Sequence, residues 1–213
     1  MSQTERVQFL RLYDSGDAAV SDGHRRNREV AARFRAAFES LGLDLGDPHL
    51  RGTDLRVARA YRQLLAGLYA GAAPRMTTFP NRERYSEMVA LTGIPFHSLC
   101  AHHLLPFFGT AHVAYLPKDR IVGLSKLARV VDFFARRPQV QERMTEQVVD
   151  FLNERLRPAG AMAVVEARHF CMEMRGISKI GPVTTTNAIR GAFEDGRSRQ
   201  EFLEMLRRTE RTA

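Results

Sequence analysis

Apolar residues recur every three or four positions along several segments of the chain, a period that is typical of amphipathic helices. The pattern predicts helices over residues 25–41, 53–69, 125–136 and 138–156. A further helix is predicted near the end of the chain, because Ser198 and Glu201 match a capping box ahead of the apolar residue Phe202. Helices therefore dominate the N-terminal part and recur in the second half.

Beyond Pro80 the pattern changes to short apolar runs, which favour strands. Strands are predicted over residues 87–91, 109–116, 161–175 and 184–189, with Pro95, Pro106 and Pro117 as breaks. Strands interleaved with a pair of helices indicate an α+β fold with an antiparallel sheet. We therefore expect a mobile arm over residues 1–24, a helical segment over 25–75 and an α+β domain over 76–213, with a hinge near 71–80.

The composition fits a folded protein, since 44% of the 213 residues are hydrophobic and 26% are charged. No apolar run approaches the roughly 18 residues that a membrane-spanning helix needs. The 2 cysteines do not make a disulfide framework, so a reducing cytoplasm is expected. The formal net charge of +8 indicates an anionic partner, either nucleic acid or a phosphorylated small molecule. No zinc-finger, RRM or helix-turn-helix signature supports nucleic acid, but charge alone leaves both partners open.

Both cysteines lie close to histidines, and this is the strongest chemical signal in the sequence. Cys100 precedes His102 and His103, while Cys171 follows His169 by two positions. Thiolate and imidazole are ligands that Zn²⁺ prefers, and a C-x-x-H pair can close around one ion on a tight turn. A third ligand from a distant segment would leave the fourth tetrahedral position open to water, as in catalytic sites.

If residues 161–175 form one strand, alternate side chains share a face. His169, Cys171, Glu173 and Arg175 would then lie together and present proton-transfer, metal-binding and anion-binding groups side by side. The alternative is an ordinary half-buried strand, in which a free cysteine acts as a small apolar residue. The C-x-x-H pair earlier in the chain favours the metal site.

The adjacent histidines are expected to have different roles, because their side chains diverge. The C-x-x-H spacing favours His103 as the metal ligand and leaves His102 free for acid–base chemistry near neutral pH. His97 and His112 lie nearby in the sequence, and both are interpreted as structural.

Two weaker signals suggest a nucleotide. Residues 123–126 (Gly-Leu-Ser-Lys) open a predicted helix, with Arg129 one turn further on, and backbone N–H groups with a lysine at a helix start favour phosphate. A solvated helix start explains the same residues equally well. Gln141 and Glu142 are either an exposed helix pair or, as an amide beside a carboxylate, groups that suit the N–H edge of guanine.

Taken together, these motifs resemble those of the GTP cyclohydrolase I family. The similarity runs from about Arg51 to Leu206, with the motifs in the family's order. It is carried by residues 98–109 (SLCAHHLLPFFG), 122–126 (VGLSK), 137–143 (RPQVQER), 169–171 (HFC) and 174–176 (MRG). The resemblance implies that residues 76–213 form a T-fold, an antiparallel sheet with helices on one face, preceded by a helical segment. It also implies a toroidal homodecamer with active sites at subunit interfaces.

The resemblance further implies a role for each candidate residue. Zinc would be bound by Cys100, His103 and Cys171, and protons would be moved by His102 and His169. A metal-activated water would attack C8 of GTP, formate would leave, and ribose rearrangement with ring closure would give 7,8-dihydroneopterin triphosphate, the first step of folate and pterin synthesis. Guanine would be held by Glu142 with Gln141. The triphosphate would meet Ser125, Lys126, Arg129, Arg175, Arg56 and Arg59.

The chain departs from the family pattern Cys-Glu-His-His, since Ala101 stands at the glutamate position. A carboxylate beside metal ligands orients imidazoles, and its loss typically costs about 10–100-fold in affinity or activity. Two alternatives therefore stay open: a specialised paralogue that acts on a related purine nucleotide or stops at a ring-opened formamidopyrimidine, and a catalytically silent nucleotide-binding subunit. Asp54 and Gly93 are smaller departures, at positions where the family usually has proline and an acidic residue.

Overall fold

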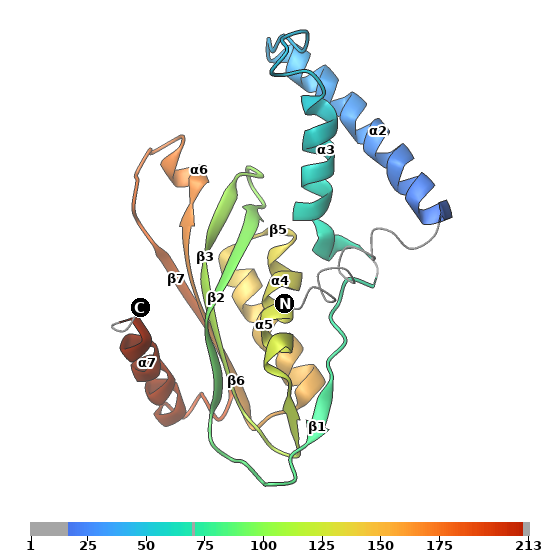
Figure 1. Cartoon of the computed structure of the whole chain (residues 1–213). Helices are drawn as coiled ribbons and strands as arrows, with labels where there is room; N and C mark the ends of the chain where they lie inside the picture. Colours follow the sequence, from blue (N-terminus) through green and yellow to red (C-terminus); the bar gives the residue numbers. More distant parts are fainter. Residues whose placement is uncertain (1–16, 70, 211–213) are drawn as a thin grey trace. The chain divides into compact units, whose positions relative to one another are not determined.

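The computed structural model describes residues 17–69 and 71–210, and the chain divides into two compact units, Met1–Leu64 and Leu65–Ala213. The first unit contains helices α2 (Asp17–Ser40) and α3 (Thr53–Leu64) (Figure 1). Phe34 packs on Tyr61 with ring centroids 5.5 Å apart, and Arg35 Nε donates to Asp54 Oδ2 at 3.0 Å. Asp54, which stands where the family usually has proline, therefore forms an ion pair between the two helices.

The helical segment differs from the prediction at both ends. α2 begins at Asp17, inside the segment that the sequence assigned to a mobile arm, and residues 1–16 of that arm lie outside the described residues. The predicted helix over residues 53–69 ends at Leu64, where the second unit begins with the 3₁₀ turn η1 (Ala66–Leu68). This turn is held in the second unit because Gly67 N–H donates to Arg136 O at 2.8 Å. A Cβ at Gly67 would collide with the carbonyl oxygen of Phe133, so the close approach requires glycine.

The second unit is built on a five-stranded sheet in the order β5-β2-β3-β6-β7. Its strands are β2 (Val89–Cys100), β3 (Pro106–Leu116), β5 (Pro138–Gln139), β6 (Gly160–His169) and β7 (Thr184–Gly191). The pairs β2–β3, β3–β6 and β6–β7 are antiparallel, whereas β5 pairs in parallel with the end of β2. A separate two-stranded sheet joins β1 (Thr78–Pro80) and β4 (Arg120–Val122). The predicted α+β fold with an antiparallel sheet is confirmed.

Helices cover both faces of this sheet (Figure 1). α4 (Leu124–Ala135) and α5 (Gln141–Leu156) bury their apolar sides against one face, in a core that includes Phe107, Leu127 and Met144. α7 (Arg197–Glu210) lies over part of the opposite face, where Phe202 packs in a second core with Met162 and Phe193. The helix pair on one face was expected, and the placement of α7 on the other face is an addition that the sequence did not indicate.

A bulge in β2 decides which side chains of that strand face the helices. The register with β3 shifts between Leu91 and Ile94, and Gly93 adopts a left-handed φ of 71° that favours glycine over the acidic residue usual in the family. The inserted residue reverses the alternation of faces, so Ile94, Phe96 and Cys100 belong to the helix-covered core. Gly93 therefore helps to place the Cys100 side chain on the face of the sheet that the helices cover.

Two strand boundaries differ from the prediction. Pro95 was expected to break the chain, but β2 runs through it, because β5 pairs only at Leu99 and Cys100 and leaves Pro95 at a sheet edge where no N–H is needed. The strand predicted over residues 161–175 ends at His169 and is followed by the one-turn helix α6 (Phe170–Glu173). The end of β6 alters the geometry of the candidate site.

The start of the last helix also differs from the prediction. α7 begins at Arg197, whose N–H donates to Asp195 Oδ1 at 3.2 Å, so Asp195 and not Ser198 receives the first N–H of the helix. Within the described residues, no helix is long and apolar enough to cross a membrane.

Candidate metal centre

Cys100, His103 and Cys171 meet at one end of the sheet, with their ligand atoms all within 4.8 Å of one another. Cys100 ends β2, His103 lies in the turn between β2 and β3, and Cys171 lies in α6 directly after β6. Because β2 and β6 both flank β3 in antiparallel register, the end of β2 and the end of β6 lie beside the start of β3. Two thiols and an imidazole from three segments form a group that could hold a metal ion.

The turn that carries the histidines is fixed by its own backbone. Leu104 N–H donates to Cys100 O and Cys100 N–H donates to Leu105 O, both at 2.8 Å. Leu104 adopts a left-handed φ of 53°, a conformation that costs energy for a residue with a branched side chain. Ala101 N–H donates to Gln139 O at 2.8 Å, which ties the turn to β5. The C-x-x-H spacing therefore becomes a compact loop with its side chains on the outside.

The two histidines of the turn both approach the same sulfur. Nδ1 of His102 and Nδ1 of His103 each lie 3.8 Å from Cys100 Sγ, and the two rings are 6.1 Å apart at an interplanar angle of 79°. Only His103 is part of the group that includes Cys171, among the described residues. The assignment of His103 as a ligand and of His102 to proton transfer stays a prediction.

The Cys171 thiol is held in an environment that resists its ionisation. Burial raises the pKa of Cys171, as do the hydrogen bond and the charge of Cys100, while Arg175 acts in the opposite direction. Two thiolates side by side repel each other, and a bound cation would offset that repulsion.

His169 is locked in orientation by two contacts. Its ring stacks on Phe107 with centroids 4.7 Å apart and an interplanar angle of 2°, and its Nε2 lies 2.8 Å from Gln141 Oε1. Burial lowers the pKa of His169 and so favours the neutral imidazole, whereas the negative charge of Glu142 acts in the opposite direction.

The neighbours of Gln141 determine which nitrogen of His169 carries the hydrogen. The amide nitrogen of Gln141 donates to the carbonyl oxygens of Val165 and Thr184, both at 2.9 Å, and to Thr186 Oγ1 at 3.2 Å. With acceptors around its nitrogen, the amide must turn its oxygen towards His169, and an oxygen needs a donor. Nε2 of neutral His169 is therefore protonated, and Nδ1 is the nitrogen that can accept a proton.

The structure gives Gln141 a task other than the predicted contact with guanine. Its side chain is buried, and both ends of its amide are engaged by the protein. Glu142, the next residue, is exposed at the start of α5 and close enough to His169 to affect its pKa. Of the two residues that the sequence paired, only Glu142 is available to a ligand.

The predicted sharing of one strand face by His169, Cys171, Glu173 and Arg175 is wrong, because β6 ends at His169. α6 turns the chain so that Cys171 approaches Cys100, whereas Glu173 pairs with Arg168. Arg175 is exposed in the loop that follows. Cys171 is brought to Cys100 and His103 by a helical turn and not by strand alternation.

The predicted phosphate contacts lie away from the metal group within one chain. Ser125 and Lys126 lie in the first turn of α4, which follows β4 at the end of the sheet where β3 finishes. Since β3 spans 11 residues at about 3.3 Å each, this end is roughly 35 Å from the turn with Cys100 and His103 (Figure 1). Arg129 is one turn further along α4. Because α4 then runs back towards β5, which pairs with Leu99 and Cys100, Ser125 and Lys126 lie nearer the far end of the sheet, whereas Arg129 lies between the two ends.

The remaining arginine candidates lie in the first unit. Arg56 and Arg59 are exposed on α3. The Arg56 guanidinium donates to Arg51 O at 2.9 Å and to Thr53 Oγ1 at 2.6 Å, so it is partly used within its own helix start.

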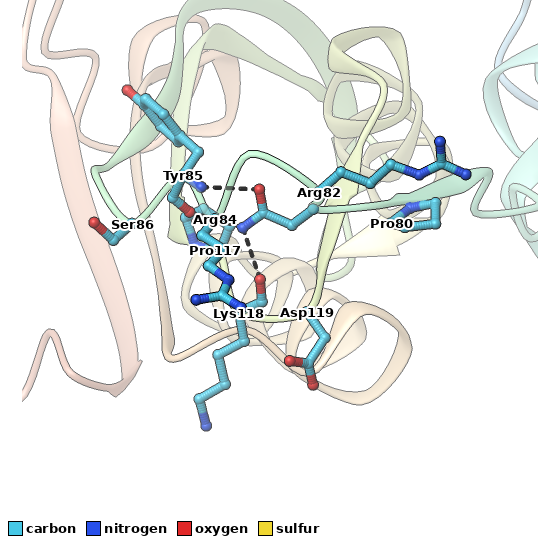
Figure 2. Close-up of a pocket in the computed structure, with 9 residues that line it drawn as sticks. Pro80, Arg82, Arg84, Tyr85, Ser86, Pro117, Lys118 and Asp119 are labelled. Carbon is cyan, nitrogen blue, oxygen red and sulfur yellow. Dashed lines mark hydrogen bonds between the residues drawn. The ribbon is translucent and has the colours of Figure 1, made fainter.

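A hollow of about 470 Å³ also lies at the end of the sheet where β3 finishes (Figure 2). Asn81 is one of its lining residues, and the amide nitrogen of Asn81 donates to Tyr85 O and Lys118 O, both at 2.8 Å. Arg84 and Lys118 line it together with Asp119, whereas the Arg82 side chain points away from them (Figure 2). None of the predicted site residues lines this hollow.

Comparisons with known proteins connect this geometry to a family. The GTP cyclohydrolase I family model matches residues 30–207. A protein named GTP cyclohydrolase 1 from Mycolicibacterium gilvum is 50% identical over 184 residues, covering 83% of this chain and 91% of its own. One of the same name from Bacteroides thetaiotaomicron is 46% identical over 178 residues, covering 84% and 91%. The crystal structure of the archaeosine synthase QueF-Like in the apo form overlaps 49% of this chain and 94% of its own, with a TM-score of 0.40 and 17% identity, which is too distant to support a conclusion.

Proposed function

The chain belongs to the GTP cyclohydrolase I family, and on that basis we propose that it hydrolyses GTP at C8 of guanine, releases formate and forms 7,8-dihydroneopterin triphosphate. The observation that carries this proposal is the convergence of the ligand atoms of Cys100, His103 and Cys171 to within 4.8 Å, in the same unit as His169, whose ring is oriented by Gln141. A metal group next to a proton acceptor is what hydrolytic ring opening needs.

Zinc is the metal proposed for this group. Two thiols and one imidazole suit Zn²⁺, and three protein ligands leave one tetrahedral position open, as in catalytic zinc sites. A zinc ion held by Cys100, His103 and Cys171 would supply Lewis acidity and lower the pKa of a water molecule at the open position.

The two remaining histidines are proposed to move protons. His169 holds its Nε2 hydrogen against Gln141, so its Nδ1 is the atom that accepts and returns a proton. Phe107 supports the ring from one face, which keeps that nitrogen in a fixed direction during the reaction. His102 is exposed on the turn next to the ligand His103 and is the second proposed proton carrier.

Guanine is proposed to bind through Glu142. A carboxylate can accept two N–H groups from the edge of guanine, and Glu142 is exposed and close to His169. The neighbouring Gln141 supports this arrangement indirectly, since it fixes His169 and anchors the first turn of α5 to β6 and β7. The base would then lie with its reacting ring facing the metal group.

The triphosphate is proposed to bind where subunits meet. Ser125 and Lys126 lie nearer the other end of the sheet from the metal group, and Arg129 lies between the two ends, so we expect a second subunit to complete the site around one GTP molecule. Arg175 and the exposed Arg56 and Arg59 are the further proposed contacts. The 174–183 loop, which exposes Met174, Ile177, Ile180 and Val183, offers apolar surface for a subunit contact. These features support sites shared between subunits, and the resemblance to the family is the basis for proposing a homodecamer.

The alternatives suggested by Ala101 are not favoured. Relatives at 50% and 46% identity carry the name GTP cyclohydrolase 1, and the Ala101 backbone is hydrogen-bonded within an ordered turn. The deciding experiment is incubation of the protein with GTP and Zn²⁺, followed by assays for formate and for oxidisable pterin fluorescence. Formation of both supports the proposal, whereas failure to consume GTP with any divalent metal would refute it.

A further inference from the structure

Arg168 and Glu173 form an ion pair across the junction between β6 and α6. Arg168 Nε donates to Glu173 Oε1 at 2.8 Å, and Arg168 Nη2 donates to Glu173 Oε2 at 2.6 Å. The side chain of Glu173 is only 7% exposed, whereas that of Arg168 is 42% exposed. A carboxylate removed from water needs donors for both oxygens, and a bidentate guanidinium supplies them in a fixed geometry.

A third donor links the pair to the following loop. The Arg168 hydrogen bond holds the pKa of Glu173 below its ordinary value, and the backbone N–H of Gly181 contributes in the same direction. Glu173 therefore joins three pieces of chain: the end of β6, the helix α6 and the far side of the 174–183 loop.

The 174–183 loop has little else to hold it. All of its residues are exposed, and Gly176, Ser178 and Gly181 have left-handed φ angles of 63°, 48° and 103°. At its base, Lys179 N–H donates to Met172 O at 3.0 Å. A segment without buried side chains depends on such polar ties for its conformation.

α6 is equally dependent on its surroundings. It comprises 4 residues, too few for a helix to be stable by itself. Phe170 packs edge-on against Phe108 with centroids 5.2 Å apart, and the Arg168–Glu173 pair fixes the other end of the helical turn. Cys171 lies between these two anchors.

We propose that Arg168 and Glu173 are positioning residues for the metal centre, because their ion pair holds α6 in the orientation that brings the Cys171 thiol to Cys100 and His103. The same pair sets the start of the loop with Arg175, the proposed phosphate contact. This inference rests on the proposed function for the identity of the site, but its test is metal binding and not turnover.

The test compares metal affinity in the full-length protein and its variants, with Co²⁺ and Zn²⁺ as probes against a competing chelator. Glu173→Ala is expected to weaken binding by about tenfold, within the range found when residues that support metal ligands are removed. The Co²⁺–thiolate absorption band should also change, because Cys171 would no longer be held at its position. The reversed pair Arg168→Glu with Glu173→Arg should restore affinity to within about threefold of the wild type, since the bond can form in the opposite sense.

Glu146→Ala is the matched control. Glu146 also forms an ion pair with an arginine, Arg190, but that pair joins α5 to β7. Glu146→Ala should leave metal affinity within about twofold of the wild type. In thermal melting of the metal-free proteins, Glu146→Ala and Glu173→Ala should lower the melting temperature by similar amounts. Arg168→Gln serves as the second test if Glu173→Ala does not fold, and the same weakening is expected.

Unchanged affinity and an unchanged Co²⁺ spectrum in Glu173→Ala or Arg168→Gln would overturn the inference. So would a reversed pair that binds metal no better than Glu173→Ala, since the effect would then belong to Glu173 alone. Absence of GTP turnover by the wild type would contradict the proposed function. The comparison of metal affinities would still test the role of Arg168 and Glu173, because it does not depend on turnover.

Discussion

The two ends of the main sheet carry different chemistry. At the end where β2 and β6 finish, thiols and imidazoles converge on one point, and backbone hydrogen bonds, ring stacking and an ion pair hold each group. At the end where β3 finishes, Ser125 is exposed and Lys126 is half-buried on the first turn of α4. The three candidate metal ligands meet within one chain, whereas the proposed phosphate contacts lie on α4, nearer the other end of the sheet.

The largest effect is expected from removing a ligand at the metal end. Cys171→Ser should release the metal and reduce turnover by about four powers of ten or more, because two remaining ligands do not hold zinc. Elemental analysis of the purified protein measures the loss. His102→Ala, although its Nδ1 is as close to Cys100 Sγ as that of His103, should keep its metal. Stoichiometric metal in the Cys171 variant would show that the metal end is not organised as proposed.

Removal of the proton carrier should have the next largest effect. His169→Ala should keep the metal but lower kcat by about two to four powers of ten, the usual contribution of general acid–base catalysis. Metal content and rapid-quench turnover on GTP separate the two roles. His97→Ala is the control. His97 is an exposed histidine on β2, and its replacement should leave kcat unchanged. Loss of metal from the His169 variant would make it a ligand instead.

Restoring the missing carboxylate sharpens the comparison within the metal end. Ala101→Glu should raise turnover on GTP by about one to two powers of ten, since a carboxylate beside metal-bound imidazoles orients them. Ala101→Gln, of similar size but uncharged, controls for steric effects. If both variants bind metal fully and turn over GTP no faster than the wild type, the turn has adapted to the small side chain and the alternative of a specialised paralogue gains support.

The smallest effect is expected at the end of the sheet where β3 finishes. Lys126→Ala should raise KM for GTP by about tenfold and leave metal content unchanged, because it removes one cation from a proposed triphosphate contact. Lys118→Ala, in the hollow at the same end of the sheet, is the matched control and should leave KM within about twofold (Figure 2). Equal effects of the two variants would mean that only general positive charge matters there.

Much of the fold and part of the site could be predicted from local sequence. Helical periodicity gave α4 and α5 to within a few residues, because their apolar faces are continuous. The C-x-x-H pair identified Cys100 and His103, since metal-ligand spacing is a local property. The strand over residues 161–175 was wrong at its end, because the pattern of alternation continues past His169 although the hydrogen bonding does not.

The sequence by itself therefore determined the family and the order of the elements and indicated the candidate metal ligands, all of which depend on residue type and short spacing. The tertiary structure decided that Gln141 serves His169, that Glu173 pairs with Arg168 and that Lys126 lies far from the metal group. The reason is physical: the acceptors that orient the Gln141 amide lie 24 and 43 positions along the chain. Hydrogen bonds over such separations exist only once the strands have paired, and no periodicity in the sequence records them.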